Sequence, residues 1–331
     1  MIQPPIANVA CDLPIANVAC DPPIANVACD LPLLIDDAAV RRHLSLDALL
    51  PAIEQALIDL SAGRVVQPLR TVLELPGPGS LLFVKPALAG NALATKLITQ
   101  VPDNAARGLP TMIATVLLLD PLTGRPLAVM DATWLTELRT AAVSAVATCA
   151  LRDQRPKRLA ILGSGALARS HALALRAVVP LRDIRVWSPT RANAERCAAD
   201  IDGSASPDAE HAVRDADIVV TVTNASTPVL MGRWLKPGAL VHAVGAPRPG
   251  WRELDDEAMA NYLIADNRLA AETESGDVIL SGAHVQCEIG EVLAGKVTVP
   301  PGVTVVFKAL GQAVEDAVAA QLVYAAVTAA Q

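Results

Sequence analysis

The chain has 331 residues, a length typical of two domains. Apolar residues make up 52% and charged residues 18%, which excludes a disordered chain and supplies enough material for a buried core. A net charge of −7 without a basic stripe excludes a general affinity for nucleic acid. The longest apolar stretches are too short to cross a bilayer, and no secretion signal is recognisable at the N-terminus. We expect neither a membrane nor a nucleic-acid partner.

The first thirty residues contain an exact repeat. Residues 5–12, 14–21 and 23–30 all read PIANVACD, and each copy carries one cysteine. Thiols nine residues apart without a histidine are poor metal ligands, so we predict a disordered tail over residues 1–32 and no metal site. The six cysteines show no CxxC or Cys/His ligand spacing, and this pattern favours a reduced, cytoplasmic location.

Residues from about 33 to 153 predict an α+β domain. Ser45 or Asp47 can cap a helix over residues 49–63, and Gly63 can end it. Short β-type runs follow, punctuated by Pro and Gly, and a small-residue segment then shows helical periodicity. The β-type runs are residues 70–75, 80–84, 92–99, 114–120 and 127–131, and the helical segment is 133–153.

From Arg158 the pattern changes to alternating strands and helices. Apolar runs at 158–163, 184–188, 218–223, 240–245 and 261–266 predict strands, and residues 166–178 and 191–201 predict helices. Such alternation implies parallel pairing through right-handed crossovers, as in a Rossmann domain. Residues 308–330 are predicted to form one long C-terminal helix.

A GxGxxA turn lies directly after the strand at 158–163. Its residues are Gly163, Ser164, Gly165, Ala166, Leu167 and Ala168. Gly163 permits a tight turn, Gly165 allows close approach of a pyrophosphate, and Ala168 allows tight packing of helix on strand. Because the next helix would point free N–H groups at a phosphate, this context favours dinucleotide binding over a structural turn.

The end of the second strand bears on the choice of cofactor. An acid there would bind the ribose 2′-hydroxyl of NAD, but residues 187–193 contain none. The side chains that could hold a 2′-phosphate are Ser188, Thr190, Arg191 and Asn193. We therefore favour NADPH over NADH; the alternative is a solvated loop with a surface arginine.

Six separated motifs resemble, in order, the ornithine cyclodeaminase/mu-crystallin family. They are GLPT (108–111), ELRTAA (137–142), GSGALA (163–168), GAPRPGWRELDDE (245–257), ESGDVILSGA (274–283) and VFKALGQAVEDAVAAQLVY (306–324). The resemblance implies a homodimer whose subunit has a substrate-binding and dimerisation domain, residues 33–142 with 300–331, and a Rossmann domain, residues 143–299. It is greatest to the ketimine reductases of this family.

The resemblance also implies site residues. Arg70 and Lys96 match ligands of the substrate carboxylate, and Arg139 and Thr140 match residues between substrate and cofactor. Further cofactor contacts are implied at Thr111, Thr223 and Val244. Lys96 is also the candidate catalytic residue, because burial could lower its pKa enough for proton delivery. The alternative is that the imine arrives already protonated, and the donor stays open.

Two departures and one ambiguous residue qualify these expectations. Pro247 stands where ornithine cyclodeaminases carry an Asp, and Pro cannot transfer a proton. Pro189 stands where mu-crystallin-like members carry an Arg, which leaves the 2′-phosphate to Arg191. Glu274 either faces the substrate or has a helix-capping or solvated role. His242, on a predicted buried strand, is expected to be structural.

The expected reaction is reduction of Δ1-pyrroline-2-carboxylate or Δ1-piperideine-2-carboxylate to L-proline or L-pipecolate. One alternative is an alanine- or opine-dehydrogenase-like reduction of an open-chain imine, and another is a non-catalytic protein that binds NADPH and a small ligand. Five- and six-membered rings differ by one methylene, worth only about 1–3 kcal/mol, so the preferred ring size stays open.

Overall fold

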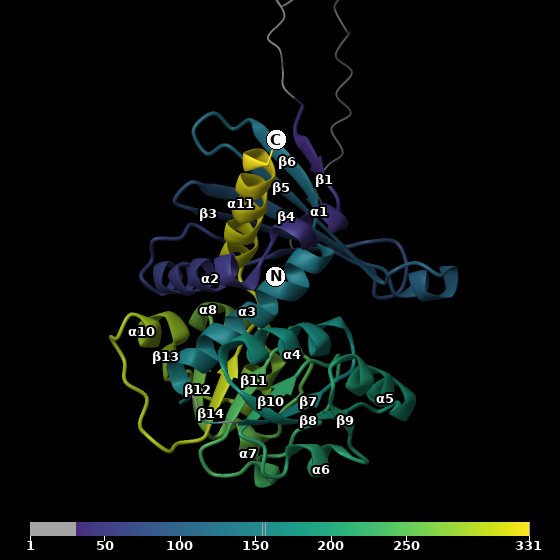
Figure 1. Cartoon of the computed structure of the whole chain (residues 1–331), viewed down its shortest axis with the longest axis vertical. Coiled ribbons are helices and arrows are strands. Elements are labelled where there is room, and N and C mark those ends of the chain that lie inside the picture. The colour runs from purple at the N-terminus through teal and green to yellow at the C-terminus, as the bar shows by residue number, and fades with distance from the viewer. Residues whose placement is uncertain (1–30, 154, 156, 331) are drawn as a thin grey trace, which may run out of the picture. The chain divides into compact units, whose positions relative to one another are not determined.

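The computed structural model describes residues 31–153, 155 and 157–330. The PIANVACD repeats, and with them the predicted tail, lie outside the described residues. The unit that begins at Pro32 contains two β-sheets, and both appear in Figure 1. No helix among the described residues is long and apolar enough to cross a membrane.

The first sheet has six strands in the spatial order β1-β6-β5-β4-β3-β2. In chain order these are β1 Leu33–Ile35, β2 Thr71–Glu74, β3 Leu81–Ala89, β4 Ala92–Gln100, β5 Met112–Leu119 and β6 Pro126–Asp131. All neighbours are antiparallel except β1 and β6. Three α-helices and a 3-10 turn accompany it: α1 Asp37–His43, α2 Leu46–Ser61, α11 Ala313–Ala329 and η1 Pro102–Arg107. The prediction of a mostly antiparallel first domain is confirmed.

Alternation along the strands determines which side chains face α11. In β4, Ala94 and Lys96 are buried on the face that α11 covers, whereas Leu97 on the opposite face is exposed (Figure 1). Successive side chains of a strand point to opposite faces, so Lys85 of β3, paired with Lys96 in the register, shares the covered face. Two lysines therefore lie between the sheet and α11.

The second sheet has eight strands in the order β13-β12-β14-β11-β10-β7-β8-β9, and every pair is parallel. Its strands are β7 Lys157–Leu162, β8 Leu181–Trp187, β9 Ser204–Ala205, β10 Ile218–Thr221, β11 Leu240–Ala243, β12 Tyr262–Ala265, β13 Cys287–Glu288 and β14 Val305–Lys308. Its helices are α4 Ala166–Val178, α5 Arg191–Asp200, α6 Ala209–Val213, α7 Asp256–Met259, α8 Arg268–Glu274, α9 Gly276–Ser281 and α10 Ile289–Leu293, with the 3-10 turn η2 Gly232–Trp234. The strand order reverses at β7, which gives the ligand-binding crevice of a doubly wound sheet and confirms the Rossmann prediction.

The C-terminal segment differs from its prediction. Residues 305–308 form β14, which pairs with β11 and β12, and helix α11 begins only at Ala313. Gly311 adopts φ +72°, a conformation that interrupts the chain between strand and helix. The prediction of one helix from residue 308 is therefore wrong at its start, and the strand belongs to the second sheet. The division into domains otherwise remains a prediction.

Helix α3 (Thr133–Leu151) links the two sheets. Its first half contributes Leu135 and Leu138 to a core that also contains Val305 and Phe307 of β14. Its second half packs on α4, where Ser144 contacts His171. One continuous helix thus runs across the predicted boundary at residues 142 and 143.

Two buried histidines anchor this packing. His171 Nδ1 lies 2.6 Å from the Leu167 carbonyl, to which it must donate, so its Nε2 accepts from the Ser144 hydroxyl at 3.1 Å. Thr148 donates to the Ser144 carbonyl and therefore accepts from His242 Nε2, which leaves His242 Nδ1 without a partner. His242 thus bonds helix α3 to strand β11, which agrees with the structural role predicted for it. Burial lowers the pKa of His171 to about 4 and that of His242 well below its usual range.

Acid is therefore expected to remove a stabilising contribution of His171. A histidine whose pKa falls on folding stabilises the native state fully above its unfolded value near 6.5, and that contribution is lost as pH falls towards the folded value. Between pH 7 and pH 5 we expect a loss of about 2 kcal/mol from His171 alone. Urea unfolding of wild type and of His171→Asn at both pH values measures it as the difference between their pH dependences, because the titration of Glu315 is common to both proteins. An unchanged pH dependence in that variant would contradict the assignment.

Candidate active site

The turn after β7 has the geometry of a phosphate-binding loop. Gly163 adopts φ +125°, and a Cβ there would lie 2.7 Å from the Val222 carbonyl oxygen. Gly165 is the N-cap of α4, and a Cβ on it would meet nothing within 4 Å. Open space therefore faces the first turn of α4, whose N–H groups carry partial positive charge. These features fit a dinucleotide pyrophosphate, and Ala168 is fully buried, as the packing argument requires.

The predicted 2′-phosphate residues gather between β8 and α5. Ser164 of the turn donates to the Ser188 hydroxyl at 3.0 Å, so the two segments are in contact. Thr190 is the N-cap of α5 and makes no side-chain capping bond. The side chain of Arg191 is 67% exposed and pairs with Glu195 at 2.8 Å. A 2′-phosphate would have to compete with that carboxylate for the guanidinium.

A cavity of about 190 Å³ lies between the first sheet and the cofactor turn. Its lining from the first sheet and α3 comprises Arg70, Phe83, Lys85, Ile98, Gln100, Met112, Thr136, Arg139 and Thr140, and the remaining lining residues are Leu167, Asn224, Val244, Pro247, Arg248, Trp251, Ala309, Leu310 and Gly311. Of the residues predicted from sequence, it brings together Arg70, Arg139, Thr140, Leu167 and Val244. Cationic side chains and the phosphate-binding turn thus share one cavity.

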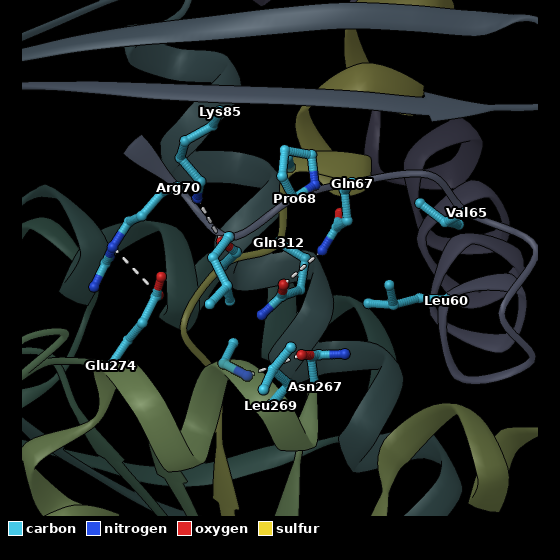
Figure 2. A pocket seen from close by; sticks show the side chains of 14 residues that line it. Leu60, Val65, Gln67, Pro68, Arg70, Lys85, Asn267, Leu269, Glu274 and Gln312 are labelled. Carbon is cyan, nitrogen blue, oxygen red and sulfur yellow. Dashed lines mark hydrogen bonds and ion pairs between the residues drawn. The ribbon is translucent and has the colours of Figure 1, made fainter. Parts of the chain in front are cut away.

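Arg70 is held at the cavity wall by two partners. It donates to the Pro247 carbonyl, and its Nε lies 3.2 Å from a Glu274 carboxylate oxygen, an ion pair drawn in Figure 2. Burial lowers the pKa of Arg70, and Glu274 partly offsets this effect. Glu274 therefore orients an arginine of the candidate site, a role that was not among those considered for it.

Behind the cavity, α11 presents two acids to the cations. Arg139 contacts Glu315 at 2.5 Å and Asp316 at 2.8 Å, and Lys96 lies 2.6 Å from Asp316. All four residues are buried. Burial opposes ionisation of Asp316, but Arg139 and Lys96 outweigh it and hold the pKa of Asp316 below its usual value. Burial raises the pKa of Glu315 to about 7, although Arg139 opposes the shift.

Lys96 lies outside the cavity lining. Its side chain has no exposed area, and its ammonium lies 3.2 Å from the hydroxyl of Thr136, which does line the cavity. Burial, reinforced by Arg139, lowers the pKa of Lys96 well below its usual value. A low pKa suits proton delivery, but the ammonium reaches the cavity only through Thr136 or by leaving Asp316. Direct contact of Lys96 with a substrate therefore stays a prediction.

Two predicted cofactor contacts also lie outside the cavity lining. Thr111 is exposed, and its carbonyl accepts from the Val101 N–H. The hydroxyl and N–H of Thr223 both donate to Glu253 at 2.6 Å. Thr223 thus helps to hold the loop that precedes Asn224, which is a lining residue.

Sequence reasoning missed several lining residues. Arg248 stacks on Trp251 with its guanidinium carbon 4.4 Å from the ring centroid, and it donates to Gln100 at 2.6 Å. Lys85 donates to the Gly311 carbonyl at 2.5 Å. A lysine on the inward-facing register of an otherwise apolar strand was a signal in the sequence for Lys85.

A second cavity, of about 210 Å³, adjoins the first and is drawn in Figure 2. Arg70, Lys85 and Gly311 line both cavities. On the far side, Gln67 donates to Gln312 at 2.8 Å and accepts from the Val314 N–H. The wall that the two cavities share therefore carries two cationic side chains. The far side of the second cavity carries amide side chains that already bond to the protein.

The strand order, the glycine turn and the adjoining cationic cavity define a two-domain protein with a Rossmann-type dinucleotide-binding half. The chain belongs to the ornithine cyclodeaminase/mu-crystallin family, whose model matches residues 32–331. It is 46% identical to the ketimine reductase mu-crystallin of Mus musculus over 294 residues, covering 86% of this chain and 94% of that protein.

Solved structures agree with this membership. The Δ1-pyrroline-2-carboxylate reductase of Thermococcus litoralis, in complex with NADH and L-proline, superposes with a TM-score of 0.85 at 30% identity, covering 90% of this chain and 98% of that one. An archaeal alanine dehydrogenase dimer with bound NAD gives a TM-score of 0.84 at 29% identity, covering 90% and 97%.

Proposed function

We propose that this protein reduces cyclic ketimine carboxylates with NADPH or NADH, converting Δ1-pyrroline-2-carboxylate to L-proline and Δ1-piperideine-2-carboxylate to L-pipecolate. The observation that carries the proposal is the shared lining of one cavity by Arg70 and Arg139 and by Leu167 of the phosphate-binding turn. The names of the relatives support the same chemistry, since they include a ketimine reductase and a pyrroline-2-carboxylate reductase.

The mechanism follows from the lining. Arg70 offers a planar fork for the substrate carboxylate, and its bonds to Pro247 and Glu274 fix its orientation. A nicotinamide cofactor held at the glycine turn of residues 163–168 would supply the hydride that reduces the imine carbon. The ring nitrogen becomes an amine and needs one proton, for which Lys96 behind Thr136 is the proposed source. Apolar neighbours such as Phe83 and Val244 exclude water from the cavity.

Absorbance of NADPH, followed with each cyclic imine, tests the function. We expect turnover with at least one ring size and no ammonia from L-ornithine with NAD, because Pro247 cannot transfer a proton and its carbonyl already accepts from Arg70. Turnover of an open-chain imine alone would favour the alanine- or opine-dehydrogenase reading. Tight binding of NADPH and a ligand without turnover would favour a binding protein.

Arg191 provides the test of cofactor choice. Arg191→Ala is expected to weaken the binding of NADPH by about 1.5 kcal/mol, roughly tenfold, because one charge-assisted contact is lost. The affinity for NADH should hardly change. Glu195→Gln should strengthen the binding of NADPH, because it releases the guanidinium of Arg191 from its ion pair. Fluorescence titration of both cofactors measures these effects. Equal losses for NADPH and NADH would mean that Arg191 does not touch the 2′-phosphate.

The uncovered face of the first sheet supports a homodimer. Helix α11 covers one face, and apolar side chains extend over the other. Among them, Leu73, Leu97 and Ile113 are 49%, 38% and 44% exposed. A contiguous apolar face of this kind marks an interface, and one of the similar structures is described as a dimer. We assign this face to a second copy of the chain, and sedimentation equilibrium of wild type and Leu97→Asp tests the assignment.

A cytoplasmic location is part of the proposal. Cys149, Cys197 and Cys287 are free thiols, as expected of a reducing compartment. Thiol titration of protein purified without reductant, together with cell fractionation, tests it.

A further inference from the structure

Lys85 differs from its neighbour Lys96 in its surroundings. The two lysines are paired in the register of β3 and β4, and both face α11. Lys96 is fully buried against Asp316, whereas Lys85 retains 8% exposure and lines both cavities. Figure 2 places Lys85 beside Arg70 on the wall that the cavities share. Of the two lysines, Lys85 is the one that a ligand in the cavity can touch.

Lys85 makes no ion pair in the described part of the chain, although Asp316 and Glu315 act on it from a greater distance. Arg70 has Glu274 as its carboxylate partner, and Arg139 has Glu315 and Asp316. Among the described residues, the ammonium of Lys85 bonds to the Gly311 carbonyl alone. An ammonium has three donors, so this bond leaves two of them for a ligand in the cavity.

Arg248 is the other lining cation without an ion pair among the described residues, but its charge is already engaged. The guanidinium stacks on Trp251 and donates to Gln100, so its faces and donors are partly occupied. Lys85 has no aromatic partner in the described structure and is more deeply buried. A buried ammonium attracts an anion more strongly than a solvated one, because the local dielectric is lower.

We infer that Lys85 is a substrate-binding residue that pairs with the carboxylate of the cyclic imine together with Arg70. The inference rests on the proposed function and names a contact that sequence motifs did not indicate. In this arrangement Lys96 acts from behind the wall, where Asp316 holds it. The charge calls for an anionic group on the ligand, and the carboxylate of the proposed cyclic imine supplies one.

A pH dependence follows from the same geometry. Burial lowers the pKa of Lys85, and Asp316 partly offsets this. Affinity for the carboxylate should be full below the pKa of Lys85 and should fall as pH rises through it. The charged groups that face Lys85 from the surrounding elements are Arg70, Lys96, Arg139, Glu274, Glu315 and Asp316. Because several of these titrate, a variant must identify the group responsible.

The experiment compares Lys85→Met, which keeps the stem and removes the charge, with Lys85→Arg, which keeps the charge. The variants are tested with a carboxylated cyclic imine and with the same ring lacking the carboxylate. We expect Lys85→Met to raise KM for the carboxylated ring by roughly 30-fold or more. KM for the ring without the carboxylate should change by less than about threefold. Calorimetric binding of pyrrole-2-carboxylate, which has the ring and the charge but no imine, should weaken in parallel.

The arginine variant and a remote lysine complete the design. Lys85→Arg should move the alkaline loss of pyrrole-2-carboxylate binding to higher pH, a shift that a purely structural role would not produce. Lys157→Met, which removes another buried lysine that pairs with Asp153, should leave both rings unaffected.

The outcomes separate this inference from the proposed function. Wild type without turnover of any cyclic imine carboxylate overturns the proposed function. If the wild type is active and Lys85→Met prefers the carboxylated ring as strongly as the wild type does, the role of Lys85 is overturned. If Arg248→Met loses the preference for the carboxylated ring and Lys85→Met keeps it, the role of Lys85 is overturned as well, and the carboxylate is assigned to Arg248.

Discussion

Arg70→Ala is expected to lower kcat/KM for the imine substrate by roughly 100-fold or more, because a charge-assisted bidentate pair is lost from a buried cavity. The change also removes the bond to Pro247 and leaves Glu274 unpaired in the wall. KM should rise, and kcat should fall as the ring loses its orientation. Steady-state kinetics with saturating NADPH measure both parameters.

Arg70→Lys serves as the matched control. An ammonium restores the charge but not the planar fork, so little activity should return. NADPH affinity, measured by fluorescence quenching, should remain at the wild-type value in both variants, because Arg70 lies on the first-sheet side of the cavity. Near-normal kcat/KM in Arg70→Ala would mean that the substrate carboxylate binds elsewhere.

Among the substitutions proposed, Asp316→Asn is expected to lower the free energy of unfolding most. The substitution keeps the shape of the side chain but leaves Lys96 without its carboxylate and Arg139 with Glu315 alone. Breaking a buried ion pair from one side costs about 3–5 kcal/mol, since the remaining charge stays desolvated. Urea unfolding followed by circular dichroism measures the free energy of unfolding.

A double variant separates the charge effect from a packing effect. Lys96→Met in the Asp316→Asn background removes the stranded ammonium, so it should recover a substantial part of the lost stability. If the two substitutions add without recovery, Asp316 stabilises the fold by some contact other than its ion pair with Lys96.

The sequence predicted those elements whose signals are local. Helix α4 has the predicted bounds, because a glycine N-cap precedes a strongly amphipathic run. Helix α2 begins after Ser45, one of the two predicted caps, which accepts from the Ala48 N–H, but it spans Leu46–Ser61 rather than residues 49–63. Strand β14 is as buried as strands β10 and β11, which were predicted, but it lies next to the helical run, to which its last residue, Lys308, was assigned.

The site could be predicted only where motifs carried it. Arg70 and Arg139, from the resemblance, and Leu167, from the glycine pattern, line the cavity, and their roles towards substrate and cofactor stay predictions. The ion pairs of Lys96 and Arg139 join residues at least 176 positions apart in the sequence, so only the packing of α11 on the sheet reveals them. For the same reason, the contrast between Lys85 and Lys96 needed the structure: both lie on one face, and α11 decides which is paired.

Helix α3 limits how the cavity can open. Thr136, Arg139 and Thr140 line the cavity from its first half, while Ser144 and Thr148 bond to His171 and His242 from its second half. An unbroken helix bonded to both sheets resists a hinge motion between them at this crossing. The hydrogen bond that Arg70 donates to the Pro247 carbonyl joins the same two halves of the protein at a second place, on the wall of the cavity.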